Sequence, residues 1–311
     1  MFNFSTDNKS LILGTALWGW GVSKAEAFNL IDSFLEQGGK FIDTATNYPI
    51  NKREADFGLA INWIESWIKE NPNSNLSVIA KVGSLDNSGA PNSNLTPEKL
   101  IADVDALMER FGNMLGCVSV HWDNRGDTTE DQLAIEKTAD SLNNLRNQGI
   151  EIGLSGIKKP ELYHNALPEL SEQWIIQVKE NLTTSNARSA YTKYFPKARY
   201  LAYGINLGGM SSIPAKKDSS STLRAITHSK ALIDHVSDLI NSEHNFKPCP
   251  RTLNELALLS TYMNAALSGV IIGPRTVEQL SDTLTYWKKL KSLKKDEIDI
   301  NFIKQLKDYS Q

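Results

Sequence analysis

The 311-residue sequence lacks the features that mark membrane, secreted or nucleic-acid-binding proteins. It has only two cysteines, Cys117 and Cys249, too few for a disulfide framework and typical of free thiols in a reducing compartment. Lys and Arg number 33 against 36 Asp and Glu, so the basic surplus that neutralises nucleic-acid phosphates is missing. No apolar run approaches the roughly 20 residues that cross a bilayer, and the polar start MFNFSTDNKS does not resemble a secretory signal. We therefore expect a cytoplasmic globular protein without nucleic-acid or membrane partners.

What the sequence does contain is a regular alternation of strand-like apolar runs and amphipathic helical segments. The candidate strands cover 11–17, 40–45, 76–82, 116–122, 150–157, 173–179, 199–205 and 268–273. Several are rich in Val, Ile and Leu, as in a parallel sheet that is covered on both faces. The alternation predicts an α/β fold in which eight parallel strands close a (β/α)8 TIM barrel, with residues 1–311 forming a single domain. A doubly wound sheet is the alternative, and the absence of a GxGxxG motif after any candidate strand disfavours it.

Short polar motifs predict where the helices begin. They lie at Ser23–Glu26, Thr96–Pro97, Pro160, Thr252–Glu255 and Thr276–Gln279, and the first and fourth have the pattern of a capping box. The connection between the seventh and eighth strands is too long for one helix and predicts two extra ones, near 223–242 and 252–267. Its Ser- and Lys-rich segment 211–221 is interpreted either as a mobile loop at an active-site mouth or as a solvated insertion. The Lys-rich C-terminus, 287–311, predicts a further surface helix.

Polar residues stand at the carboxyl ends of three consecutive candidate strands, the end of a (β/α)8 barrel that carries function. Asp43, Lys81 and His121 follow the second, third and fourth strands, and Tyr48 lies in the loop after Asp43. Each residue alone has a structural explanation: a loop cap, a buried ion pair, a core histidine or a wall aromatic. Their joint occurrence at neighbouring strand ends indicates a catalytic site.

Through these motifs the sequence resembles the aldo-keto reductase family. The segments FIDTATNY, IAKVG and SVHWD are similar to the family's Asp-and-Tyr motif, its lysine strand end and its histidine strand end, and the likeness runs from LILGTALWGWG to GPRTVEQL. The resemblance implies a barrel enzyme that reduces an aldehyde or ketone with NADPH, or oxidises the corresponding alcohol with NADP+.

The chemistry of the four side chains is consistent with that reaction. A tyrosine phenol has a reference pKa near 10, and an adjacent ammonium favours the phenolate and lowers that pKa. We expect Tyr48 to be the general acid and Lys81 to lower its pKa. We further expect Asp43 to orient Lys81, and His121 to position and polarise the substrate carbonyl.

The resemblance also implies a dinucleotide site. Its residues would be Ser155, Gln177, Tyr203, Gly204, Gly208, Gly273, Arg275, Thr276, Gln279 and Asp282. Ser155 and Gln177 would hold the nicotinamide carboxamide, and Tyr203 would stack on the ring. Arg275 and the helix start capped by Thr276 would bind the 2′-phosphate of NADPH, because free N–H groups and the helix dipole attract an anion there.

Two positions depart from the family pattern. Gly156 stands where relatives usually have Asn after the serine, and Gly204 with Ile205 replaces the usual Ser-Pro. The first change removes one amide contact to the carboxamide.

Tryptophans near the strand ends indicate the walls of the substrate pocket. Trp18, Trp20 and Trp122 are consistent with a small carbonyl compound or a sugar stacked on aromatic rings, and the first two fit a core position equally well. The scattered histidines predict no metal site, and the sequence does not decide the oligomeric state.

Two other functions remain open. Lys179, on the sixth candidate strand, has the position of a Schiff-base lysine in barrel aldolases, provided that burial lowers its pKa. Alternatively, the barrel binds a dinucleotide as a regulatory subunit with little turnover, an interpretation compatible with Gly156 and Gly204. The intact set of four polar residues favours turnover.

Overall fold

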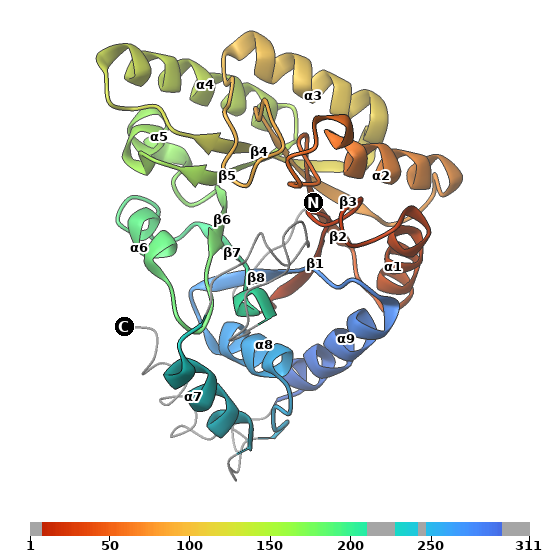
Figure 1. The fold of residues 1–311 in the computed structure, drawn as a ribbon. Helices are drawn as coiled ribbons and strands as arrows, with labels where there is room; N and C mark the ends of the chain where they lie inside the picture. The colour runs from red at the N-terminus through yellow and green to blue at the C-terminus, as the bar shows by residue number, and fades with distance from the viewer. Residues whose placement is uncertain (1–7, 210–227, 242–246, 294–311) are drawn as a thin grey trace.

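A closed barrel of parallel strands forms the centre of the molecule. The structure is a computed structural model that describes residues 8–209, 228–241 and 247–293. Within these ranges eight strands pair in chain order, and β1 pairs with both β2 and β8, which closes the ring (Figure 1). The strands are β1 Ser10–Gly14, β2 Phe41–Ala45, β3 Ser77–Val82, β4 Leu115–Asp123, β5 Glu151–Ile157, β6 Ile175–Lys179, β7 Arg199–Tyr203 and β8 Leu267–Ile272. The predicted (β/α)8 barrel is confirmed.

Helices surround the strands and connect each to the next (Figure 1). They are α1 Lys24–Glu36, α2 Leu59–Glu70, α3 Pro97–Phe111, α4 Thr129–Asn147, α5 Pro160–Ala166, α6 Asn186–Thr192, α7 Lys230–Asn241, α8 Leu253–Met263 and α9 Val277–Lys291. Both α7 and α8 lie between β7 and β8, as predicted for the long connection. The segment 211–221 and the part of the C-terminus beyond residue 293 lie outside the described residues.

The predicted capping motifs begin helices, but two of them differ from the prediction in detail. Ser23 caps α1 by accepting the N–H of Glu26, yet the Glu26 carboxylate accepts the N–H of Val277 at the start of α9. Similarly, Thr252 caps α8, whereas the carboxylate of Glu255 accepts the N–H of Arg251. Neither glutamate therefore completes a capping box, because each reaches a different backbone group.

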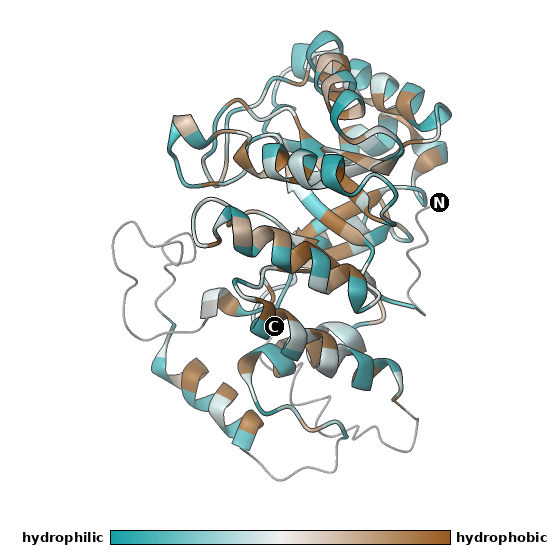
Figure 2. Ribbon diagram, turned by 90° about the vertical axis from the view of Figure 1, so that its right-hand side faces the viewer, coloured by the Kyte–Doolittle hydropathy of each residue, from teal (hydrophilic) through white to brown (hydrophobic). Residues whose placement is uncertain are grey.

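Strand side chains alternate between the barrel interior and the surrounding helices. Ile12, Phe41, Ile79, Cys117, Ile175 and Leu201 form a cluster inside the barrel. Their neighbours along the strands join the larger core that packs against the helices, and Figure 2 shows hydrophobic residues concentrated on the central strands. Both cysteines are free thiols, and burial raises the pKa of Cys117 to about 12. None of the helices in the described ranges is long and apolar enough to span a bilayer.

Candidate active site

A cavity of about 790 Å³ opens at the carboxyl ends of the strands, a size typical of ligand pockets. Most of the predicted site residues line it: Asp43, Tyr48, Lys81, His121, Trp122, Ser155, Gln177, Tyr203, Gly204, Gly208 and Gly273. The barrel topology explains this gathering, because the ends of all the parallel strands meet at one rim.

A buried ion pair lies at the floor of the cavity. Lys81 Nζ is 2.6 Å from Asp43 Oδ2, and Gln177 Nε2 donates to the other carboxylate oxygen of Asp43 at 2.7 Å. Thr15 fixes the backbone of Asp43, since its N–H and its hydroxyl both donate to the Asp43 carbonyl, at 3.1 and 3.0 Å. Both charges therefore have defined partners, as buried ions require. The amide nitrogen of Gln177 is directed at Asp43.

Tyr48 lies beside this ion pair, with Lys81 Nζ 4.8 Å from the centroid of its ring. Burial, and secondarily the negative charge of Asp43, raise the pKa of Tyr48 well above its usual value of 10. The expected lowering of this pKa is therefore wrong for the net shift, because removal of the phenol from water outweighs the attraction of the Lys81 ammonium, which is itself paired with Asp43. Tyr48 is thus fully protonated at neutral pH.

His121 faces Tyr48 edge-to-face, with ring centroids 6.0 Å apart. Burial and the positive charge of Lys81 lower the pKa of His121 well below 6.5, so the imidazole is neutral. Its Nδ1 lies 3.0 Å from the hydroxyl oxygen of Ser84, a residue absent from the sequence interpretation. Ser84 follows Lys81 by three residues, in the loop after β3, but no motif identifies it.

The three tryptophans assigned to the substrate pocket occupy different environments. Trp122 lines the cavity. Trp18 belongs to the hydrophobic core with 1% of its surface exposed, and Trp20 packs against that core. The left-handed turn at Gly19 places this segment against Leu59 at the start of α2, which explains why neither Trp18 nor Trp20 reaches the cavity lining.

Four predicted cofactor residues lie just before α9 or in its first two turns, outside the cavity lining: Arg275, Thr276, Gln279 and Asp282. Thr276 Oγ1 accepts the N–H of Gln279, and Gln279 Oε1 accepts the N–H of Arg275. Glu26 Oε1 accepts the N–H of Val277 at 2.9 Å. The N–H groups of Arg275, Val277 and Gln279 are therefore bound by protein side chains, whereas the sequence led us to expect free N–H groups for an anion here.

Lys179 lines the cavity but is exposed, so the burial required by the aldolase interpretation is not met. Tyr203 also lines the cavity, and burial together with the proximity of Tyr48 raises its pKa to about 12. Further polar lining residues, none of them assigned a role in the site from the sequence, are Asn181, Thr183, Thr184, His228 and Ser229. Within the described ranges, no three His, Cys, Asp or Glu side chains gather as metal ligands.

The sequence also matches known proteins. The model of the aldo/keto reductase family covers residues 10–301, and the chain belongs to this family of oxidoreductases. The uncharacterized oxidoreductase YrpG of Bacillus subtilis is 24% identical over 293 residues, which are 88% of this chain and 86% of that protein. Saccharomyces cerevisiae AAD6, provisionally named an aryl-alcohol dehydrogenase, is 29% identical over 160 residues, 48% of this chain and 69% of that protein.

The fold has matches among solved structures. The holo form of the aldo-keto reductase AKR11C1 from Bacillus halodurans superposes on this chain with a TM-score of 0.66. The match covers 97% of this chain and 92% of that protein, and the two sequences are 15% identical. This likeness concerns the barrel fold.

Proposed function

We propose that the protein reduces an aldehyde or ketone, such as a sugar or another small carbonyl compound, to the alcohol with NADPH. The observation that carries the proposal is the cluster of Asp43, Lys81, Tyr48 and His121 in one cavity at the strand ends. Membership of the aldo/keto reductase family and the oxidoreductase names of the relatives support the reaction class. Free thiols fit a cytoplasmic location.

The cavity lining fits a nicotinamide dinucleotide. Gly204 and Gly208 line the cavity, and both have left-handed backbone conformations. Because glycine has no side chain, a ligand can approach their backbone closely. Ser155 and Gln177 offer polar groups to a carboxamide, and Tyr203 offers a ring. When bound, the reduced nicotinamide supplies the hydride.

Tyr48 is the proton donor in this proposal. Its raised pKa keeps the phenol protonated until the carbonyl oxygen gains negative charge. The Lys81 ammonium, 4.8 Å from the ring centroid, then stabilises the phenolate that remains after proton transfer. Asp43 holds that ammonium in place.

His121 directs the carbonyl. A neutral imidazole has one N–H. When the Ser84 hydroxyl donates to Nδ1, the proton lies on Nε2, which can then donate to the substrate oxygen. His121 thereby stabilises the developing charge without contributing a net charge of its own.

Two charged side chains near the start of α9 have opposite effects on the binding of the 2′-phosphate that distinguishes NADPH from NADH. The Arg275 guanidinium favours a 2′-phosphate, since guanidinium–phosphate pairs are charge-assisted. The Glu26 carboxylate, bound to the N–H of Val277, repels it. We propose that NADPH binds more tightly than NADH, and that the negative charge of Glu26 makes this difference in affinity smaller.

The test combines dinucleotide binding with turnover of a panel of carbonyl compounds. Quenching of tryptophan fluorescence should give saturable NADPH binding in both the unmodified protein and Tyr48→Phe, while only the unmodified protein turns over. Full turnover in Tyr48→Phe would disprove the assignment of the acid. NADPH binding without turnover of any carbonyl would favour the regulatory barrel. Borohydride trapping of an imine at Lys179 would support the aldolase alternative.

A further inference from the structure

The alternation of side chains along β4 is broken at Trp122. Cys117 points into the barrel, and Val118 and Val120 pack in the outer core with the helices. Simple alternation places His121 inside, the next residue outside and Asp123 inside again. Instead, His121 and Trp122 both line the cavity.

The break has a backbone cause. Trp122 has φ +62°, a left-handed conformation that bulky residues adopt only when their surroundings impose it. The ladder to β5 continues on both sides, since His121 pairs with Ser155 and Asp123 pairs with Ile157. The distortion is therefore confined to one residue, directly after the histidine of the site.

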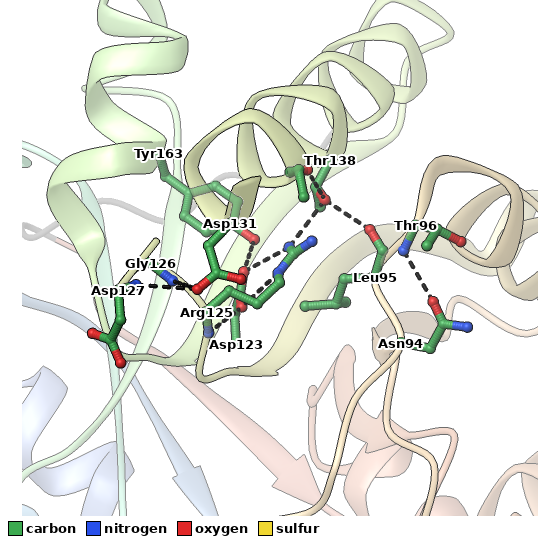
Figure 3. Close-up of polar contacts among 11 residues, drawn as sticks. Asn94, Leu95, Thr96, Asp123, Arg125, Gly126, Asp127, Asp131, Thr138 and Tyr163 are labelled. Carbon is green, nitrogen blue, oxygen red and sulfur yellow. Dashed lines mark hydrogen bonds and ion pairs between the residues drawn. The ribbon is translucent and has the colours of Figure 1, made fainter. Parts of the chain in front are cut away.

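Asp123 is held on the helix side by a buried network, drawn in Figure 3. Its carboxylate accepts hydrogen bonds from Nε and Nη2 of Arg125, at 2.9 and 2.8 Å, and from the Arg125 backbone N–H at 3.0 Å. The Tyr163 hydroxyl on α5 donates to it at 2.7 Å. Arg125 also donates to Thr138 on α4, whose hydroxyl contacts the carbonyl of Leu95 (Figure 3).

Gly156 on β5 accommodates the displaced ring. A Cβ atom at this position would lie 2.9 Å from two ring carbons of Trp122, and Gly156 itself has φ +71°. A side chain here would therefore push the ring away. The glycine that departs from the family pattern is thus the partner that the conformation of Trp122 requires.

We propose that Asp123, Arg125 and Tyr163 are positioning residues. By holding the Asp123 carboxylate against α4 and α5, they impose the left-handed conformation of Trp122. Trp122 then forms an aromatic wall of the substrate pocket beside His121, with ring centroids 6.2 Å apart. The role in substrate positioning rests on the proposed carbonyl reduction, whereas the effect on Trp122 does not depend on it.

The effect on Trp122 can be measured without turnover. The chain contains seven tryptophans, so protein labelled with 5-fluorotryptophan gives a small set of 19F resonances, and Trp122→Phe assigns the one of interest. Arg125→Met and the milder Tyr163→Phe should both shift that resonance. Gly156→Ala should shift it too, because it displaces the same ring without touching the network.

Arg199→Met is the matched control. Arg199 is about as exposed as Arg125 and forms an ion pair with the half-buried Glu151 at 2.7 Å, but both residues begin their strands, at the opposite end of the barrel. This variant should leave the Trp122 resonance in place.

Kinetics then test the positioning role. With a reducible carbonyl, Arg125→Met should lower kcat/KM by about tenfold or more, as small misplacements of reacting groups do. The dissociation constant of NADPH should not change, and Arg199→Met should retain kcat/KM within about twofold.

An unchanged Trp122 resonance in Arg125→Met and Tyr163→Phe would overturn the proposal. If Arg125→Met shifted the Trp122 resonance but kept its kcat/KM, the role in substrate positioning would be overturned. A shifted resonance in a protein that reduces no carbonyl would support the network and overturn the proposed function instead.

Discussion

The carboxylate of Glu26, in the first turn of α1, binds the backbone N–H of Val277 at the start of α9, with Oε1 and N 2.9 Å apart. The two residues are 251 positions apart in the chain and meet only because β8 pairs with β1. A negative side chain thus occupies the positive end of a helix dipole, where the sequence predicts a place for a phosphate.

Removing the charge of Glu26 should increase the preference for NADPH. Glu26→Gln keeps an oxygen that can accept from Val277 but removes the negative charge. Charges at a helix start contribute about 0.3 to 1 kcal/mol, so the NADPH dissociation constant should fall by roughly two- to fivefold while that of NADH stays unchanged.

Fluorescence titration with both dinucleotides measures this ratio. Glu36→Gln, exposed at the far end of α1, is the control and should change neither constant. Arg275→Met should move the ratio in the opposite direction. An equal change for NADPH and NADH in Glu26→Gln would contradict the electrostatic explanation.

Removing one partner of the Asp43–Lys81 pair should destabilise the fold as well as stop the reaction. Both side chains are at most 5% exposed, so Asp43→Asn leaves a buried ammonium without its counter-charge. Such a loss typically costs about 3 to 5 kcal/mol of unfolding free energy.

Denaturant unfolding followed by circular dichroism gives this value. Lys197→Met, which removes an exposed ion pair with Glu172, should leave the unfolding midpoint unchanged. If Asp43→Asn unfolded at the same denaturant concentration as the unmodified protein, the pair would have no net role in stability.

Stability should fall as the pH drops below 6.5 because of His121. Its pKa in the folded protein lies well below 6.5, so over this range the unfolded chain binds a proton that the folded one does not. The unfolding free energy should therefore decrease by up to about 1.4 kcal/mol per pH unit between pH 6.5 and 5.

His121→Gln should remove this component and flatten the profile in that window. Unfolding midpoints recorded at half-unit pH steps for both proteins measure the difference. Parallel profiles would mean that His121 does not stay neutral in the fold.

The general architecture could be predicted from the sequence because its signals are local. The apolar runs identify the strands, and short motifs such as Thr96–Pro97 identify helix starts. Asp43, Lys81 and His121 could be grouped in advance, since parallel strands bring their carboxyl ends to one rim. Periodicity and chain order suffice for each of these inferences.

Other features of the site follow from contacts between residues distant in the chain. Ser84 reaches His121 from another strand end, and Trp18 lies in the core, one of the two positions that the sequence left open for it. The direction of the Tyr48 pKa shift depends on burial and on which partner Lys81 binds. No spacing in the sequence encodes how far a phenol is removed from water.

By itself, the sequence determined the order of strands and helices, the rim on which the polar residues lie, and the family to which they belong. Tertiary structure alone decided the protonation of Tyr48 and His121, the occupant of the α9 start and the left-handed turn at Trp122. The reason is physical: hydrophobic period and caps act over a few residues, whereas desolvation, ion pairing and imposed backbone conformation depend on every element packed nearby.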